Sequence, residues 1–334
     1  MASEQRTAFV TGGSGFIGGH LLRRLVSDAW RVRALARSQG SADAVAALGA
    51  EPVRGDLDDL ASMAAGAEGC SVAFHLAAHL GQWGAPEDFE RGNVTGTRNA
   101  LAACEQAGVR RFVHCGTEAA LMAGEPLVNV DETAPRRPDS KALYSATKAR
   151  AEEAVLAASR EGFETLSVRP RFVWGADDTT LLPNILAMVE AGRFSWIDGG
   201  THLTAITHVD NVVEGLVLAA ERGRPGEVYF VTDGEPVIFR EFLSELISAK
   251  GVEPPKRSVP GWIARLAAPA AETAWRVLPL KGEPPLTRFA YWVSAQECTI
   301  DISKARRELG YAPVVSKEQG LAELRASDAA DRNR

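Results

Sequence analysis

The stretch Phe9-Val10-Thr11-Gly12-Gly13-Ser14-Gly15-Phe16-Ile17-Gly18-Gly19-His20 lies close to the N-terminus and decides the fold. An apolar segment, residues 6–11, leads into this glycine-rich turn, and a segment with helical apolar spacing follows it. Gly12 permits the tight turn, Gly15 lets the backbone approach a pyrophosphate, and Gly18 lets the helix pack on the strand. This order of strand, turn and helix predicts a dinucleotide site with the phosphates at the helix N-terminus. A glycine-rich connection without a ligand is the alternative.

Length and composition favour an enzyme with two lobes. The 334 residues exceed one typical core, so we expect a nucleotide-binding domain and a smaller lobe. The net charge of -6 offers no basic patch for nucleic acid. The cysteines show no spacing typical of zinc sites or disulfide frameworks, so we expect no metal, reduced thiols and a cytoplasmic location. They are Cys70, Cys104, Cys115 and Cys298.

No segment is expected to cross a membrane. The first strand begins within a few residues of the N-terminus, which leaves no room for a signal peptide. The most apolar late stretch, residues 259–280, contains Arg265, Glu272, Arg276 and three prolines, and therefore cannot span a bilayer. Its Trp262 lies with Ile263 and Leu266 on one expected helical face. The stretch is either a packing helix of the smaller lobe or a lid over an apolar substrate.

Short apolar strands alternate with helical patterns through the first half of the chain. This alternation predicts right-handed crossovers and a doubly wound parallel sheet of the Rossmann type. The clearest helical patterns are residues 89–107 and 140–159. The strands expected after the first are Arg31–Ala36, Glu51–Arg54, Val72–His75, Arg111–Cys115 and Thr165–Val168.

From about residue 178 the rhythm changes. We expect a helix over 183–192, one strand over 203–208, a helix over 210–221 capped by Asp210, and a strand over 227–231. The predicted boundaries are a dinucleotide domain of residues 1–178 to which 205–235 returns, a mostly helical substrate lobe of 179–204 and 236–325, and a flexible tail of 326–334.

Tyr144 and Lys148 carry the expected chemistry. They stand at i and i+4 and share one face of the helix after the fifth strand. A lysine ammonium beside a phenol favours phenolate, so we expect the pKa of Tyr144 to be lowered. Tyr144 could then exchange a proton with a substrate oxygen while hydride moves to or from a nicotinamide. An exposed helical pair without function is the alternative.

Together with Thr117, the pair Tyr144 and Lys148 forms a predicted active site. It ends the segment 112–117, a strand that reaches the carboxyl edge of the sheet, where doubly wound folds bind ligands. Its hydroxyl could hold the substrate oxygen near Tyr144.

Here the chain resembles an extended short-chain dehydrogenase/reductase. The Thr-Gly-x-x-Gly-x-x-Gly turn and the Tyr-x-x-x-Lys pair carry this resemblance, together with blocks that span nearly the whole length. The chain is most similar to the 3β-hydroxysteroid dehydrogenase and dihydroflavonol reductase branches. The blocks are His75–Ala78, Asn93–Asn99, Val168–Arg171, His208–Val212 and Asp301–Tyr311.

The resemblance implies roles at matching positions. Tyr144 is the catalytic acid/base, Lys148 also holds the nicotinamide ribose, and Thr117 takes the usual Ser/Thr place. Asp56 accepts from the adenine amino group, although a helix N-cap is an even alternative for it. The cofactor site implied in this way comprises Gly12, Gly15, Phe16, Ile17, Gly18, Arg37, Ser38, Asp56, Leu57, Leu76, Ala77, Ala78, Tyr144, Lys148, Pro170 and Val173.

The segment after the second strand bears on the choice of cofactor. NAD enzymes often place an acid about twenty residues past the glycines, to bind the ribose hydroxyls. This chain has Arg37 and Ser38 there, which could hold a 2′-phosphate. We therefore favour NADP over NAD, with surface stacking of Arg37 on adenine as the alternative.

Bulky apolar residues of the second lobe favour an apolar alcohol or ketone as substrate. Most of them are expected to be core. The named substrate candidates are Trp83, Leu121, Arg171, Trp174 and Leu182, and a homodimer is left open.

Two other functions remain open. A nucleotide-sugar epimerase with bound NAD would use the same tyrosine and lysine, with Arg193, Arg240 and Lys256 as diphosphate ligands. A non-catalytic NADP-binding sensor or scaffold is the second alternative. A dehydratase is disfavoured because Glu118 is followed by alanine, not by a second acid.

Overall fold

The computed structural model describes the backbone of residues 5–332 and the side chains of 5–328. Its centre is a seven-stranded sheet in the order β12-β7-β5-β4-β1-β2-β3, and every neighbouring pair is parallel. The winding reverses between β1 and β4, which is where such sheets bind ligands. The doubly wound sheet is therefore confirmed. Its strands are β1 (Thr7–Thr11), β2 (Arg31–Ala36), β3 (Glu51–Arg54), β4 (Val72–His75), β5 (Arg111–Cys115), β7 (Glu164–Pro170) and β12 (Val228–Val231).

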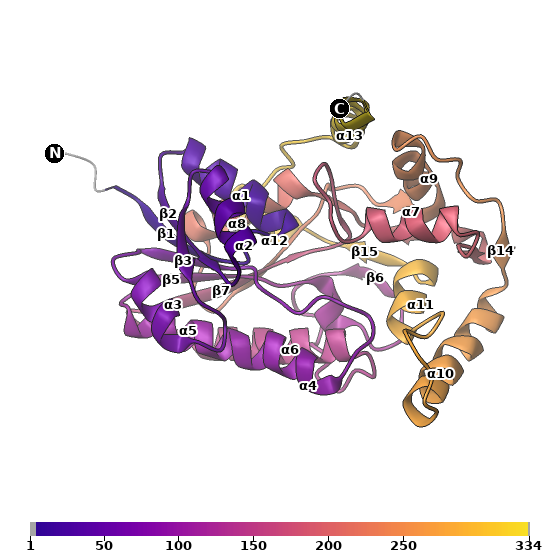
Figure 1. Ribbon diagram of the computed structural model, residues 1–334, viewed down its shortest axis with the longest axis horizontal. Coiled ribbons are helices and arrows are strands. Elements are labelled where there is room, and N and C mark those ends of the chain that lie inside the picture. The colour runs from indigo at the N-terminus through magenta and orange to yellow at the C-terminus, as the bar shows by residue number, and fades with distance from the viewer. Residues whose placement is uncertain (1–4, 333–334) are drawn as a thin grey trace.

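Helices cover both faces of this sheet (Figure 1). On one face lie α1 (Phe16–Ser27), α2 (Gln39–Ala47), α8 (Val209–Arg222) and α12 (Ser303–Leu309). On the other lie α3 (Leu60–Ala67), α4 (Pro86–Phe89), α5 (Gly96–Gln106) and α6 (Leu143–Ala157).

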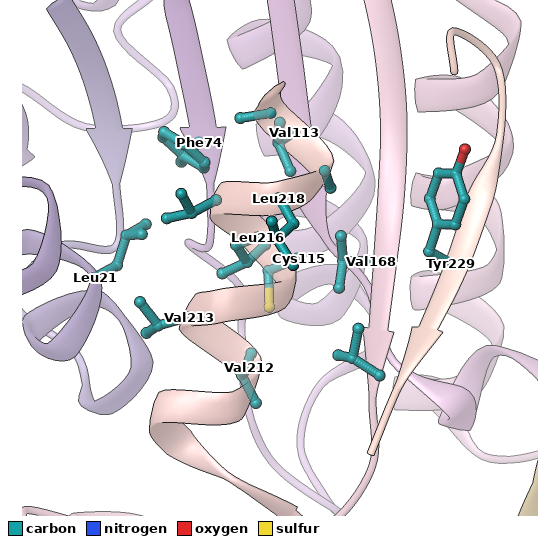
Figure 2. Packing of buried hydrophobic residues seen from close by; sticks show 14 of the residues in the cluster. Leu21, Phe74, Val113, Cys115, Val168, Val212, Val213, Leu216, Leu218 and Tyr229 are labelled. Atoms are coloured by element: carbon teal, nitrogen blue, oxygen red, sulfur yellow. The ribbon is translucent and has the colours of Figure 1, made fainter. Parts of the chain in front are cut away.

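The packing of α8 shows why these helices form. Its apolar residues recur three and four positions apart, so that Val212, Val213 and Leu216 share one stripe. Figure 2 shows this stripe against the sheet, near Val113 of β5 and Val168 of β7.

The second lobe lies beside the carboxyl edge of the sheet (Figure 1). Trp174, Trp196, Phe239 and Phe242 are the largest members of its buried core. Its helices are α7 (Leu182–Glu190), α9 (Phe239–Ala249), α10 (Gly261–Val277) and α11 (Arg288–Ala295). A four-stranded sheet combines β13 (Val237–Ile238), β10 (Leu203–Thr204), β15 (Cys298–Ile300) and β6 (Leu127–Val130). Two strand pairs complete it, β8 (Val173–Trp174) with β11 (Thr207–His208) and β9 (Trp196–Ile197) with β14 (Ser258–Val259).

Two local predictions were wrong. The single strand expected over 203–208 is two strands, β10 and β11, which belong to different sheets. Asp210 does not cap α8: the side chain of His208 accepts from the Asp210 amide, and Asp210 instead bonds His20. The helix expected over 89–107 is confirmed, with a π-helical segment, Glu90–Thr95, between α4 and α5.

The C-terminal helix α13 (Lys317–Arg332) extends into the segment expected to be a flexible tail, and residues 333–334 lie outside the described chain. Within the described residues, no helix is both long and apolar enough to cross a bilayer.

Candidate active site

The glycine turn is built by close backbone contacts. Gly12 has φ +76°, and a Cβ there would lie 2.7 Å from the amide nitrogen of Ala77. A Cβ on Gly18 would lie 2.0 Å from the carbonyl oxygen of Gly12. A Cβ on Gly15 would lie 3.3 Å from the carbonyl oxygen of Gly12, a tight contact, but no other atom of the described chain lies within 4 Å, so the rest of that side of the turn is open. The turn therefore combines tight packing on the protein side with room for a ligand on the other.

The N-terminus of α1 fits a pyrophosphate. Gly15 is its N-cap, and no side chain caps the first turn. Its amide donors are thus available for phosphate oxygens, which the helix dipole also attracts. Phe16 and Ile17 begin this helix, and Leu76 and Ala77 lie against Gly12, as the sequence predicts for a cofactor site.

Arg37 and Asp56 meet at the carboxyl ends of β2 and β3. The Nε of Arg37 lies 3.8 Å from an Asp56 carboxylate oxygen, and 84% of the Arg37 side chain is exposed. Ser38 caps α2, its hydroxyl accepting from the Ser41 amide. The cap of α3 is Asp59, so Asp56 is free of the capping role considered for it. The Arg37 guanidinium is thus exposed but paired with Asp56, and its place beside the N-terminus of α2 suits a phosphate.

The structure brings Tyr144, Lys148 and Thr117 together. Tyr144 lies in the first turn of α6, and Thr117 follows β5 at the carboxyl edge of the sheet. Burial, followed by the Glu118 carboxylate, raises the pKa of Tyr144, and a hydrogen bond with Thr117 opposes this. The phenol is therefore protonated at neutral pH, ready to donate.

The expectation that Lys148 lowers the pKa of Tyr144 was wrong. The ammonium donates instead to the Cys115 carbonyl at 3.0 Å and to the Nε2 of His114 at 3.3 Å. Burial lowers the pKa of Lys148 itself. Burial dominates the pKa shift of Tyr144 because a buried phenolate loses its hydration. That loss costs more free energy than attraction to Lys148, which is hydrogen-bonded elsewhere, could offset.

His114 is a site residue that sequence reasoning missed. Burial and then Lys148 hold its pKa well below its usual value, so the ring is neutral. Because Nε2 accepts from Lys148, we assign the proton to Nδ1, which then donates to Ser167 Oγ at 3.2 Å. Ser167 donates to Glu152 at 2.8 Å. His114 thus holds Lys148 at the end of β5. The sequence signal that could have identified His114 is its place on β5, three residues before Thr117.

Glu118 and Arg171 form a buried pair behind Thr117. The Thr117 hydroxyl donates to Glu118 at 2.7 Å, and Arg171 donates to the other carboxylate oxygen at 2.6 Å. Arg171 also bonds Thr204 and has no exposed side-chain surface. It therefore cannot contact substrate as predicted. Glu118, which sequence reasoning weighed only for dehydration, orients the Thr117 hydroxyl.

Of the other substrate candidates, three are buried in the core and one, Trp83, is half-buried. Leu121, Trp174 and Leu182 are each at most 5% exposed and pack in the core. Trp83 is half-buried, with the Arg276 guanidinium 4.0 Å from its ring centroid. Phe289 of α11 packs edge-on against Tyr144, with ring centroids 5.4 Å apart. The second lobe therefore closes over the site through Phe289.

Four remaining cofactor candidates follow the same sheet edge. Pro170 ends β7 and Val173 begins β8, while Leu57 packs beside Gly96 below β3. Ala78 continues the loop after β4, beyond the contact of Ala77 with Gly12.

Comparison with known proteins agrees with this geometry. Residues 9–260 match the 3-beta hydroxysteroid dehydrogenase/isomerase family. The chain is 47% identical over 322 residues to the 4-hydroxy-2-methyl-3-oxo-4-farnesyl-3,4-dihydroquinoline-1-oxide ketoreductase of Stigmatella aurantiaca, and 96% of each chain is covered. It is 34% identical over 331 residues to the 3-beta-hydroxysteroid dehydrogenase of Mycolicibacterium neoaurum, covering 94% of this chain and 89% of that one.

A solved structure shares the fold. DesIV, the dTDP-glucose 4,6-dehydratase of Streptomyces venezuelae with NAD and TYD bound, superposes with a TM-score of 0.76 at 24% identity and 98% coverage of each chain. At that identity the likeness concerns the fold alone. The family match and the full-length relatives confirm the resemblance stated above: this chain belongs to the 3-beta hydroxysteroid dehydrogenase/isomerase family and is a dehydrogenase/reductase.

Proposed function

We propose that this enzyme reduces a ketone on a bulky apolar molecule to a secondary alcohol, with NADPH as the hydride donor. The observation that carries the proposal is the placement of the Tyr144 phenol beside Thr117, at the carboxyl edge of the sheet where the glycine turn also lies. The Stigmatella relative is named as a ketoreductase of a farnesylated 3-oxo compound, which supports an apolar ketone.

A nicotinamide bound at the glycine turn would supply the hydride that the carbonyl carbon accepts. Tyr144 donates its phenolic proton to the carbonyl oxygen, so that the C=O bond becomes CH–OH. Lys148, held by His114 and the Cys115 carbonyl, lies one helical turn from Tyr144, where it would hold the nicotinamide ribose. Thr117, whose own proton goes to Glu118, is hydrogen-bonded to Tyr144 and positions its hydroxyl, and Phe289 excludes water from the face of Tyr144.

The test is a screen of apolar ketones, enones and hydroxysteroids with NADPH and NADH, followed by nicotinamide absorbance. We expect turnover with an apolar ketone. Turnover only of nucleotide sugars, without net change in cofactor absorbance, would instead establish an epimerase. Cofactor binding without any turnover would establish a sensor.

The basic residues suggested for an epimerase diphosphate are partly engaged elsewhere. Arg240 stacks on Trp196, 5.4 Å from its centroid, and Lys256 pairs with Glu253 at 2.9 Å. We therefore rank the epimerase second.

The four cysteines are free and buried, which supports a reducing cytoplasmic location. A homodimer stays a prediction, since no contact between two copies bears on it.

Arg37→Asp is expected to lower the preference for NADPH over NADH by about 10- to 100-fold. The change removes a charge-assisted bond to the 2′-phosphate, of about 1.5–3 kcal/mol, and adds an acid that can bind ribose hydroxyls. The measured quantity is the ratio of kcat/KM with the two cofactors. Arg37→Gln is the control, because it removes the cation without adding an acid, and should fall between parent and Arg37→Asp. An unchanged ratio would place the 2′-phosphate elsewhere.

The double variant Glu118→Gln/Arg171→Gln is expected to lower kcat by roughly 10-fold, because the Thr117 hydroxyl loses its fixed orientation. Changing both partners avoids leaving one buried charge alone. The alkaline limb of the kcat/KM profile should move to lower pH, since the Glu118 carboxylate no longer raises the pKa of Tyr144. Thermal unfolding checks that the variant is folded. A folded variant with the parent's rate and pH profile would show that Glu118 does not act on the site.

A further inference from the structure

His208, which precedes α8, carries a buried nitrogen without a hydrogen-bond partner among the described residues. Its side chain is 1% exposed, and Nδ1 accepts from the Asp210 amide at 3.3 Å, which assigns the ring proton to Nε2. Within the described part of the chain, no atom at hydrogen-bond distance accepts this proton from Nε2. Native proteins rarely leave a buried polar atom unpaired, so Nε2 of His208 indicates a ligand at this position.

Two glycines leave the same edge of the ring uncovered. A Cβ on Gly175, in the loop after β8, would lie 3.1 Å from Nε2 of His208, and a Cβ on Gly320 of α13 would lie 3.0 Å from it. Both distances are tighter than ordinary van der Waals contact. A larger residue at either position would crowd the space that a ligand of Nε2 needs, so the glycines keep this nitrogen accessible.

Two carboxylates stand beside His208. An oxygen of Glu323, on α13, lies 4.0 Å from Nε2, and an oxygen of Asp210, in the first turn of α8, lies 3.9 Å from Nδ1. One nitrogen of His208 and one oxygen from each carboxylate lie within 4.8 Å of one another. A cation with bonds of about 2.0–2.2 Å spans separations of up to about 4 Å, and a rotamer change of the exposed Glu323 side chain shortens the rest.

The charges of these residues favour a cation. Burial lowers the pKa of His208 below its usual value, so its imidazole is neutral at pH 7, the form that binds metals. A hydrogen bond from His20, 2.7 Å from Oδ1 of Asp210, lowers the pKa of Asp210, which is therefore ionised. Among the described residues, no lysine or arginine pairs with Glu323. Negative charge without a matching cation thus lies next to a neutral imidazole.

We propose that His208, Asp210 and Glu323 bind one Zn²⁺ ion. An imidazole nitrogen with two carboxylate oxygens is a donor set that favours Zn²⁺ over Mg²⁺ and Ca²⁺, which prefer oxygen ligands. Coordination uses the lone pair of Nε2, so the ring proton moves to Nδ1 and the long bond from the Asp210 amide is lost. Water completes the coordination on the exposed side of Glu323. Cysteine spacing, from which no metal was expected, does not bear on this donor set.

The site joins two helices that are distant in the sequence. Asp210 belongs to α8, which packs on the central sheet, whereas Glu323 belongs to α13. Leu321 and Leu324 of α13 pack in the core of the second lobe. A Zn²⁺ ion therefore links α13 to α8 and stabilises the folded chain, because these ligands meet only there. This role is independent of the proposed ketone reduction.

Equilibrium dialysis against ZnCl₂ tests the binding, after the full chain has been treated with EDTA and dialysed. Elemental analysis should give one Zn²⁺ per chain, and equal concentrations of Mg²⁺ or Ca²⁺ should not displace it. Glu323→Gln should lower the affinity for Zn²⁺ at least about tenfold, because it removes an anionic ligand and keeps the size of an exposed side chain. Circular dichroism checks that the variant is folded.

Hydrogen exchange locates the bound ion. At a free Zn²⁺ concentration about ten times the Kd, the amides around Glu323 should exchange about tenfold more slowly, because opening α13 releases the ion. In Glu323→Gln the same concentration should leave their exchange nearly unchanged.

Glu318→Gln is the matched control, because Glu318 is an exposed acid of the same helix that bonds Ser316 at 3.0 Å. It should bind Zn²⁺ and exchange like the parent. Absence of Zn²⁺ from the parent would overturn the proposal. Equal affinity in the parent and Glu323→Gln would do so too, since the ion would then be adventitious. Equal loss in Glu318→Gln would show that general negative charge, and not this site, holds the ion, and would likewise overturn it.

Discussion

Tyr144→Phe is expected to lower kcat/KM for ketone reduction by at least about 100-fold while leaving cofactor affinity unchanged. The variant removes the phenolic proton donor, but the ring remains and still packs against Phe289. Phosphate binding depends on the turn at Gly12, Gly15 and Gly18, which the change does not touch. Steady-state rates and fluorescence titration with NADPH measure the two quantities.

A matched control for this variant is Tyr291→Phe, on α11 beside Phe289. It removes a phenolic hydroxyl of the second lobe and should leave kcat/KM within about threefold of the parent, as for a residue outside the reacting group. If Tyr144→Phe also stays within threefold, another group protonates the substrate and the assignment of Tyr144 fails.

Glu152→Ala is expected to lower the free energy of unfolding by about 3–5 kcal/mol, because it leaves a buried guanidinium without its partner. Arg169 donates to both carboxylate oxygens of Glu152, with Nε 3.0 Å from each, and both side chains are fully buried. The guanidinium also lies 5.2 Å from the ring centroid of Phe230. This ring carries no charge, so it cannot take the place of the Glu152 carboxylate. Chemical denaturation gives the free energy.

Glu153→Ala, one residue along α6, is the control. Its side chain is 43% exposed and its nearest cation, Arg136, is 3.9 Å away. Such a surface pair is worth about 0–1 kcal/mol, so this variant should unfold close to the parent. The double variant Glu152→Leu/Arg169→Met should recover much of the lost stability. Equal effects of Glu152→Ala and Glu153→Ala would mean that water solvates Arg169.

Four of the seven strands of the central sheet could be predicted from the sequence to the residue. The expected bounds of β2, β3, β4 and β5 are those of the structure. β4 and β5 lie inside a sheet covered on both faces, so they are short, mainly apolar runs, and that pattern is visible in one dimension. β3 is an edge strand with three exposed residues. The strand over 203–208 failed because its two halves pair with different partners, which no local pattern records.

The part of the candidate site that depends on local spacing could be predicted equally well from the sequence. Tyr144 and Lys148 are one helical turn apart, and Gly12, Gly15 and Gly18 act within one turn of chain, so their geometry follows from spacing alone. Thr117 could be placed because every parallel strand ends at the same edge.

Only the tertiary structure decided which charges meet and which apolar residues are buried. Glu118 pairs with Arg171, 53 residues away, and Lys148 with His114, 34 residues away. The pKa of Tyr144 moves opposite to the prediction because desolvation depends on all neighbouring atoms. Trp174 and Trp262 are equally apolar in sequence, yet one is 1% and the other 68% exposed. Hydrophobicity measures the gain from leaving water, whereas packing among distant elements determines which side chains obtain it.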